Sequence, residues 1–176
     1  MHKVEDLVVY PTHGIGRVED IITRSSKNNK EKEAYYIIKI NSTGVKILMP
    51  VGNAEKLGIR EVSDTRKINK ALNIIKQSTK VVPNGHWNRR QKEYLNKVKS
   101  GSIFEMAEVF RDLTALQYSK PLSFGEKRIL ENVENLLVSE IAESKHINAH
   151  SARMILKKSL PVLPQQHYPN VSVSLS

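Results

Sequence analysis

Residues 34–49, with the sequence AYYIIKINSTGVKILM, decide how the N-terminal third of the chain folds. Two runs rich in β-branched and aromatic residues, 34–41 and 45–49, flank the turn Asn41-Ser42-Thr43-Gly44. Strand-forming runs on either side of a short turn that contains glycine predict a β-hairpin. We therefore expect a β structure in this part of the chain.

Further strands are predicted on the N-terminal side of this hairpin. Residues 7–10 and 17–22 are strand-like and are joined through the Pro- and Gly-containing segment 11–16, while 25–33 is a polar stretch that we expect to be a loop. Short strands separated by turns are typical of a small, strongly bent antiparallel β-barrel. Residues 53–58 fit a short helical turn that ends at glycine.

Beyond about residue 61 the apolar residues recur at helical spacing. The segments Ser102–Glu105 and Ser123–Glu126 match the capping box, in which a serine and a glutamate satisfy each other's backbone amides. Asp64 and Asn148 are further N-cap candidates, and a second helix is expected over about 87–100. The residues expected to face the helical core are Ile68, Leu72, Ile75, Tyr94, Leu95, Val98, Ile103, Met106, Ala107, Val109, Phe110, Leu113, Leu116, Ile129, Leu130, Val133, Leu136, Leu137 and Ile141.

The predicted fold class is therefore α+β, with two domains and a tail. Residues 1–60 form a small antiparallel β-barrel, and residues 61–160 form an all-α domain of four to five helices. Residues 161–176 contain several prolines and alternating serines and are expected to be a flexible tail.

The charge of the chain favours a nucleic-acid partner. The 176 residues carry a formal net charge of +10, and six cations against one acid fall within residues 80–99. A basic stripe of this kind is the electrostatic footprint of a nucleic-acid binder. The chain has no cysteine, which excludes disulfides, thiolate metal sites and cysteine nucleophiles. Neither a signal peptide nor an apolar run of membrane-spanning length is recognisable, so we expect a cytoplasmic protein with no membrane partner.

The only tryptophan lies in the basic stretch His86-Trp87-Asn88-Arg89-Arg90-Gln91-Lys92, directly after a Pro-Asn-Gly turn signal. Apolar wedges that partly unstack a base step, accompanied by cations on the backbone, are characteristic of minor-groove proteins. The alternative is that Trp87 is a core anchor and the cations are a solvated face, because tryptophan is usually well buried.

Motifs for catalysis or for cofactors are weak. Gly14-Ile15-Gly16 lacks the third glycine of a dinucleotide site and the Lys-Ser/Thr of a P-loop, so a tight turn is expected there. His146 and His150 are four residues apart but lack the glutamate of a zincin motif. We predict no enzyme activity, cofactor, metal or small-molecule substrate.

The chain resembles the CarD-type bacterial transcription factors over about residues 3–145. The matching segments, in family order, are 8–16 (VVYPTHGIG), 35–38 (YYII), 50 and 53–60 (P and NAEKLGIR), 87–90 (WNRR), 100–101 (SG), 106–113 (MAEVFRDL) and 122–128 (LSFGEKR). The first domain alone is also similar to a module of the transcription-repair coupling factor.

This resemblance implies a Tudor-like first domain that docks on the RNA polymerase β subunit and a helical domain that contacts promoter DNA at the upstream edge of the melted region. It implies that the family tryptophan, matched by Trp87, wedges into the minor groove and stabilises the open complex. The positions implied to bind DNA are Trp87, Arg89, Arg90, Lys92, Lys127 and Arg128, and those implied to bind polymerase are Arg24, Lys46, Ile47 and Leu48.

Two departures from the family pattern affect these expectations. Leu48 stands where some members carry an arginine that faces polymerase, so this contact is expected to be lost or to move to Lys46. Residues 114–116 replace a more basic stretch. The main competing hypothesis is a general DNA- or RNA-binding protein without a polymerase partner, and an enzyme or a pure protein scaffold is the third.

Overall fold

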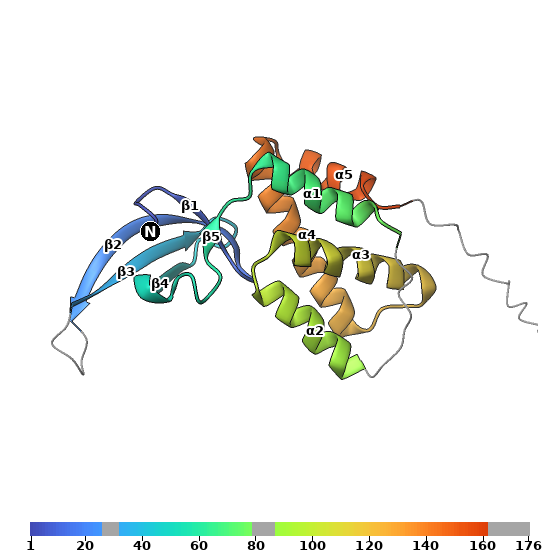
Figure 1. The fold of residues 1–176 in the computed structure, drawn as a ribbon, viewed down its shortest axis with the longest axis horizontal. Helices are drawn as coiled ribbons and strands as arrows, with labels where there is room; N and C mark the ends of the chain where they lie inside the picture. The colour runs from blue at the N-terminus through green and yellow to red at the C-terminus, as the bar shows by residue number, and fades with distance from the viewer. Residues whose placement is uncertain (26–31, 79–86, 162–176) are drawn as a thin grey trace, which may run out of the picture.

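The computed structural model describes residues 1–25, 32–78 and 87–161, and over these residues a five-stranded antiparallel sheet precedes five α-helices (Figure 1). The predicted α+β class is confirmed. The elements are β1 (Leu7–Tyr10), β2 (Gly14–Ser25), β3 (Lys32–Ile40), β4 (Lys46–Pro50), the short 3₁₀ helix η1 (Val51–Asn53), β5 (Arg60–Glu61), α1 (Thr65–Lys76), α2 (Trp87–Lys99), α3 (Ile103–Ser119), α4 (Phe124–Lys145) and α5 (Ala149–Lys158).

The strands follow the order β4-β3-β2-β1-β5, with the predicted hairpin formed by β3 and β4. Strand β2 begins at Gly14 instead of the predicted residue 17, and it continues to Ser25 while β3 already begins at Lys32. The predicted turn and loop were therefore too long. In the added part of these strands Arg24 pairs with Glu33, and both side chains are exposed to water. Oppositely charged residues that face each other across two strands are compatible with a sheet.

Two separate hydrophobic cores result. The smaller one lies on one face of the sheet and includes Val18, Tyr36 and Ile38, and the larger one fills the space between the helices. Figure 1 shows the sheet beside the helical domain. In this view α2 lies at the bottom of the helical domain, and α1 and α5 lie at the top of it.

Most residues predicted to face the helical core are buried, with two exceptions. Leu95 on α2 is exposed, and Leu130 on α4 is only partly buried. The prediction for Leu95 is wrong because α2 buries a narrow stripe, which Tyr94 and Val98 already fill. A short helix at the edge of a bundle needs only such a stripe.

The helix N-caps largely match the predictions. Asp64, Ser123 and Asn148 each accept a hydrogen bond from the backbone three residues ahead, and Ser123–Glu126 is a complete capping box. Ser102 caps α3 in the same way, but the Glu105 carboxylate accepts a hydrogen bond from the Ser100 hydroxyl. The capping box predicted at Ser102 is therefore only half formed.

Candidate nucleic-acid and protein interfaces

Helix α2 begins at Trp87, as the turn signal before it predicted. The side chains of Trp87 and Asn88 lie outside the described part of the structure, so the wedge remains a prediction. From Arg89 onward the side chains are described.

Arg89 and Arg90 have opposite environments although they are neighbours in the sequence. The Arg89 side chain is 83% exposed, and its Nε lies 3.1 Å from Glu93 Oε1, one turn along the helix. The Arg90 side chain is only 13% exposed, and its Nη2 lies 3.3 Å from Oε1 of Glu126, which is 1% exposed. Arg89 can therefore reach a phosphate, whereas Arg90 connects α2 to the first turn of α4.

Glu126 is the acceptor at the centre of this connection. Its carboxylate accepts a hydrogen bond of 2.8 Å from the backbone amide of Ser123, and Lys120 Nζ lies 3.9 Å away. Burial acts to raise the pKa of Glu126, but the hydrogen bonds from Ser123, the charge of Lys120 and the hydrogen bond from Arg90 outweigh it, so the pKa lies below its ordinary value. Glu126 is thus an ionised, buried anchor for both helices.

The other predicted DNA contacts are solvent-exposed. Lys92 on α2 and Lys127 and Arg128 on α4 all face water, and none of the three forms an ion pair with another residue that the structure describes. The Arg90–Glu126 pair brings the first turns of α2 and α4 together. We call the exposed side chains Arg89, Lys92, Lys127 and Arg128 the basic face; it has the chemistry to bind phosphates.

The predicted polymerase contacts fall on the two faces of the sheet. Leu48 pairs with Ile37 on β3, and Arg24 pairs with Glu33, an even number of residues away on the same strand. Side chains directly opposite each other share a face, and alternate residues of a strand share a face. Leu48 and Arg24 therefore lie on the outer face of the sheet.

Lys46 also lies on this outer face, and it belongs to β4, which is an edge strand of the sheet. Its Nζ is 2.6 Å from Oε2 of Glu19, a residue that lies at the β-bulge between Val18 and Asp20. The hydrogen bond from Lys46, together with the charge of Lys39, holds the pKa of Glu19 below its ordinary value against the effect of desolvation. A partner that binds Lys46 must compete with this carboxylate.

Ile47 points to the opposite side. It pairs with Ile38 and packs against the core of the sheet. The outer face also includes three partly exposed residues that were not predicted as polymerase contacts, namely Ile22, Tyr35 and Ile37. The sequence signal that predicts them is the alternation of side chains between the two faces of β2 and β3.

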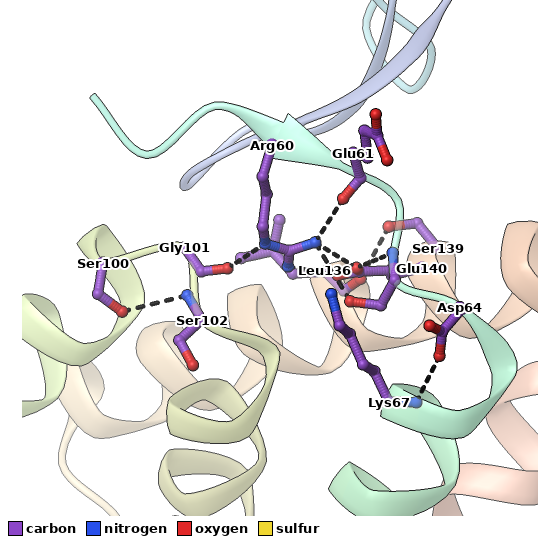
Figure 2. Close-up of polar contacts among 11 residues, drawn as sticks. Arg60, Glu61, Asp64, Lys67, Ser100, Gly101, Ser102, Leu136, Ser139 and Glu140 are labelled. Atoms are coloured by element: carbon purple, nitrogen blue, oxygen red, sulfur yellow. Dashed lines mark hydrogen bonds and ion pairs between the residues drawn. The ribbon is translucent and has the colours of Figure 1, made fainter. Parts of the chain in front are cut away.

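An ion pair between a partly exposed arginine and a buried glutamate connects the sheet to the helices (Figure 2). Arg60 on β5 donates to both carboxylate oxygens of Glu140 on α4, at 2.6 and 3.0 Å, and its Nε donates to the Gly101 carbonyl at 2.7 Å. The backbone amide of Ser63 donates to Glu140 Oε1 at 2.9 Å. Every oxygen of the buried carboxylate is thus paired, which gives the contact a fixed direction.

Close packing of glycine and proline completes this junction. A Cβ placed on Gly58 would lie 3.0 Å from Cγ of Pro11 and 3.1 Å from the carbonyl oxygen of Ser100. A Cβ on Gly101 would lie 3.0 Å from the Gly58 carbonyl oxygen. The loops of the sheet and the α2–α3 turn are therefore in direct backbone contact, with no room for a side chain. The junction, defined by Arg60, Glu140, Gly58, Gly101 and Pro11, places the outer sheet face and the basic face on one body.

None of the helices that the structure describes is both long enough and apolar enough to cross a membrane. Over the same residues no group of three or more histidine and acidic side chains is arranged to bind a metal ion.

Comparison with known proteins shows what the two halves resemble. A family model described as the CarD-like/TRCF RID domain matches residues 2–63, and one described as the CarD C-terminal domain matches residues 70–157. The chain is 32% identical over 149 residues to YdeB of Bacillus subtilis strain 168, which is named as a candidate transcription factor. This alignment covers 84% of the chain and 94% of that relative.

Proposed function

The chain belongs to the CarD family of transcription regulators, and we propose that it binds RNA polymerase and promoter DNA at the same time and thereby stabilises the open complex. In this proposal residues 1–60 dock on the polymerase β subunit, and residues 61–160 contact DNA at the upstream edge of the transcription bubble. It would act in the bacterial cytoplasm, on the nucleoid.

The observation that carries the proposal is that two different surfaces are joined through one closely packed junction. The outer sheet face offers Leu48 among partly exposed apolar residues, with Arg24 on the same face. Such a mixed apolar and cationic surface suits a protein partner. The basic face offers exposed cations, which suit a phosphate backbone.

The chemistry of stabilisation follows from these surfaces. The cations of the basic face supply an affinity for DNA that does not depend on sequence and falls steeply with salt. Binding to polymerase raises the effective concentration of the helical domain at the promoter. Trp87, as a minor-groove wedge at the start of α2, would oppose re-pairing of the melted DNA.

A pull-down of RNA polymerase by the full chain tests the protein half of the proposal. Leu48→Asp should abolish retention of polymerase, because it introduces a charge into an apolar contact. Leu95→Asp is the matched control, since Leu48 and Leu95 are 41% and 38% exposed but lie on different domains. No retention of polymerase even by the wild type would favour a general nucleic-acid binder without a polymerase partner, and retention by both variants would contradict the proposed contact at Leu48.

A footprint of polymerase on a promoter, with and without the protein, tests the DNA half. We expect added protection at the upstream edge of the bubble, and we expect this protection to disappear with Leu48→Asp at the same protein concentration. Protection spread evenly along the DNA, unchanged by Leu48→Asp, would contradict the proposed site.

A further inference from the structure

The first residue of α4, Phe124, is the most exposed aromatic side chain of the part of the chain that the structure describes, at 82%. Single exposed apolar residues are normal on protein surfaces, so exposure alone carries no function. The surroundings of this ring are what distinguish it.

Lys127 and Arg128 follow Phe124 by three and four residues on the same helix, and both are exposed. Residues at these spacings are neighbours on one helix face. The ring therefore lies beside two cations of the basic face. Glu126, which lies between the ring and the two cations in sequence, is buried and paired with Arg90. The exposed Glu131, one turn beyond the two cations, offsets one of their two charges, so the surface beside the ring stays positive.

Phe124 does not belong to a larger apolar surface of α4. The apolar stripe of this helix, which includes Ile129 and Val133, is packed into the helical core. Binding to a membrane surface uses a continuous apolar helix face, which α4 does not offer. A single ring among cations is the combination by which proteins bind single-stranded nucleic acid, with stacking on a base and cations on the backbone.

We propose that Phe124 stacks on an unpaired DNA base beside the double-stranded edge that the basic face binds. This inference rests on the proposed function and adds a second aromatic contact to it. A fully paired duplex keeps the faces of its bases covered, and opening a step costs free energy. The melted edge of a promoter offers uncovered bases at no such cost, so the ring should discriminate between the two forms of DNA.

The test measures binding of the full chain, at low salt, to two DNA molecules of the same sequence. One is fully paired, and the other is a fork junction with one unpaired strand. Phe124→Ala should weaken binding to the fork by about tenfold, the scale of one base–aromatic stack, and leave binding to the duplex unchanged. Phe124→Tyr, which retains an aromatic ring, should bind the fork like the wild type.

Two further variants make the outcomes distinguishable. Met154→Ala removes an exposed apolar side chain from α5 and should change neither affinity. Lys127→Ala should weaken binding to both DNA molecules, because a phosphate contact is present in each. If Lys127→Ala weakens both and Phe124→Ala weakens neither, or both equally, the stacking inference is overturned while the proposed function stands. If neither substitution changes either affinity, the DNA half of the proposed function fails with it.

Photo-crosslinking in the complete promoter complex identifies the partner directly. Phe124→p-benzoylphenylalanine should crosslink to DNA at the upstream edge of the bubble, and the same substitution at Met154 should not. A crosslink to a polymerase subunit, or cosedimentation with phosphatidylglycerol vesicles that Phe124→Ala abolishes, would overturn the assignment to DNA.

Discussion

At the scale of single residues, two adjacent arginines of α2 have different roles: one belongs to the basic face, and the other stabilises the protein. Arg89 is exposed and pairs only within its own helix, whereas Arg90 is enclosed and pairs with Glu126 on α4. We therefore expect alanine at Arg89 to affect DNA binding and alanine at Arg90 to affect stability.

Arg89→Ala should weaken binding to all DNA sequences alike and leave the melting temperature unchanged, since it removes a phosphate contact from a solvated surface. Arg90→Ala should destabilise the protein by about 3 kcal/mol, because it removes the nearest cation from a buried carboxylate. Titration with two unrelated duplexes measures the effect of Arg89→Ala on DNA binding, and denaturant unfolding measures the effect of Arg90→Ala on stability. A loss with Arg89→Ala on one sequence only would indicate base readout instead.

For Trp87 we expect a loss of function without a loss of fold. Trp87→Ala should shorten the lifetime of the promoter open complex, measured after a heparin challenge, while thermal unfolding followed by circular dichroism stays near that of the wild type. A substantial drop in melting temperature would identify Trp87 as a core residue and would remove the wedge from the mechanism. Tyr94→Ala is the control, because Tyr94 is buried in α2 and must destabilise the fold.

At the scale of secondary-structure elements, the first turns of α2 and α4 depend on one carboxylate. Glu126 completes the capping box of α4 and accepts from Arg90 on α2. Its ionised form is the one that both contacts need, and its pKa is correspondingly below the ordinary value of 4.5.

This arrangement predicts a pH dependence of stability. Because the folded-state pKa of Glu126 is lowered, its contribution is present above about pH 4.5 and is lost as the pH falls through the folded value. Glu126→Gln should cost about 3 kcal/mol at neutral pH, and the difference from the wild type should shrink as the pH falls below 4.5 and through the folded-state pKa of Glu126. Glu131→Gln, an exposed substitution on the same helix, should show no such trend. A constant difference across this range would mean that Glu126 acts only through its shape.

At the scale of the whole molecule, the junction fixes the geometry between the two proposed binding surfaces. Arg60 and Glu140 pair across 80 positions of sequence, and the chain at Gly58 lies directly against Pro11 and Ser100. If both surfaces bind at once, a change in their relative angle should weaken the complex of the protein with both polymerase and DNA. It should have a smaller effect on the complex with polymerase alone or with DNA alone.

Two glycines with similar backbone angles allow a matched test of this idea. Gly58 and Gly44 have φ of +75° and +70°, so alanine strains the backbone at both, by about 1–2 kcal/mol. Only at Gly58 does the added Cβ meet other atoms, whereas none lies within 4 Å at Gly44. Gly58→Ala should therefore shorten the open-complex lifetime by up to about tenfold, with unchanged affinity for duplex DNA, and Gly44→Ala should not. Equal lifetimes for the two variants would indicate that a flexible tether is sufficient.

Local features of this protein followed from the sequence alone. The N-caps at Asp64, Ser123 and Asn148, the buried helix stripes and the start of α2 at Trp87 all depend on residues within one or two turns of each other. The basic stretch and the ordered family segments are likewise visible in one dimension, and they led to the fold class and the family.

Contacts between distant residues were decided only by the tertiary structure. Which of two adjacent arginines is buried depends on Glu126, 36 positions away, and the faces that separate Leu48 from Ile47 depend on their pairing with β3. The Arg60–Glu140 junction and the isolation of Phe124 among cations have the same origin. A sequence pattern fixes the periodicity of an element, but the partner that covers each face is set by packing of the whole chain.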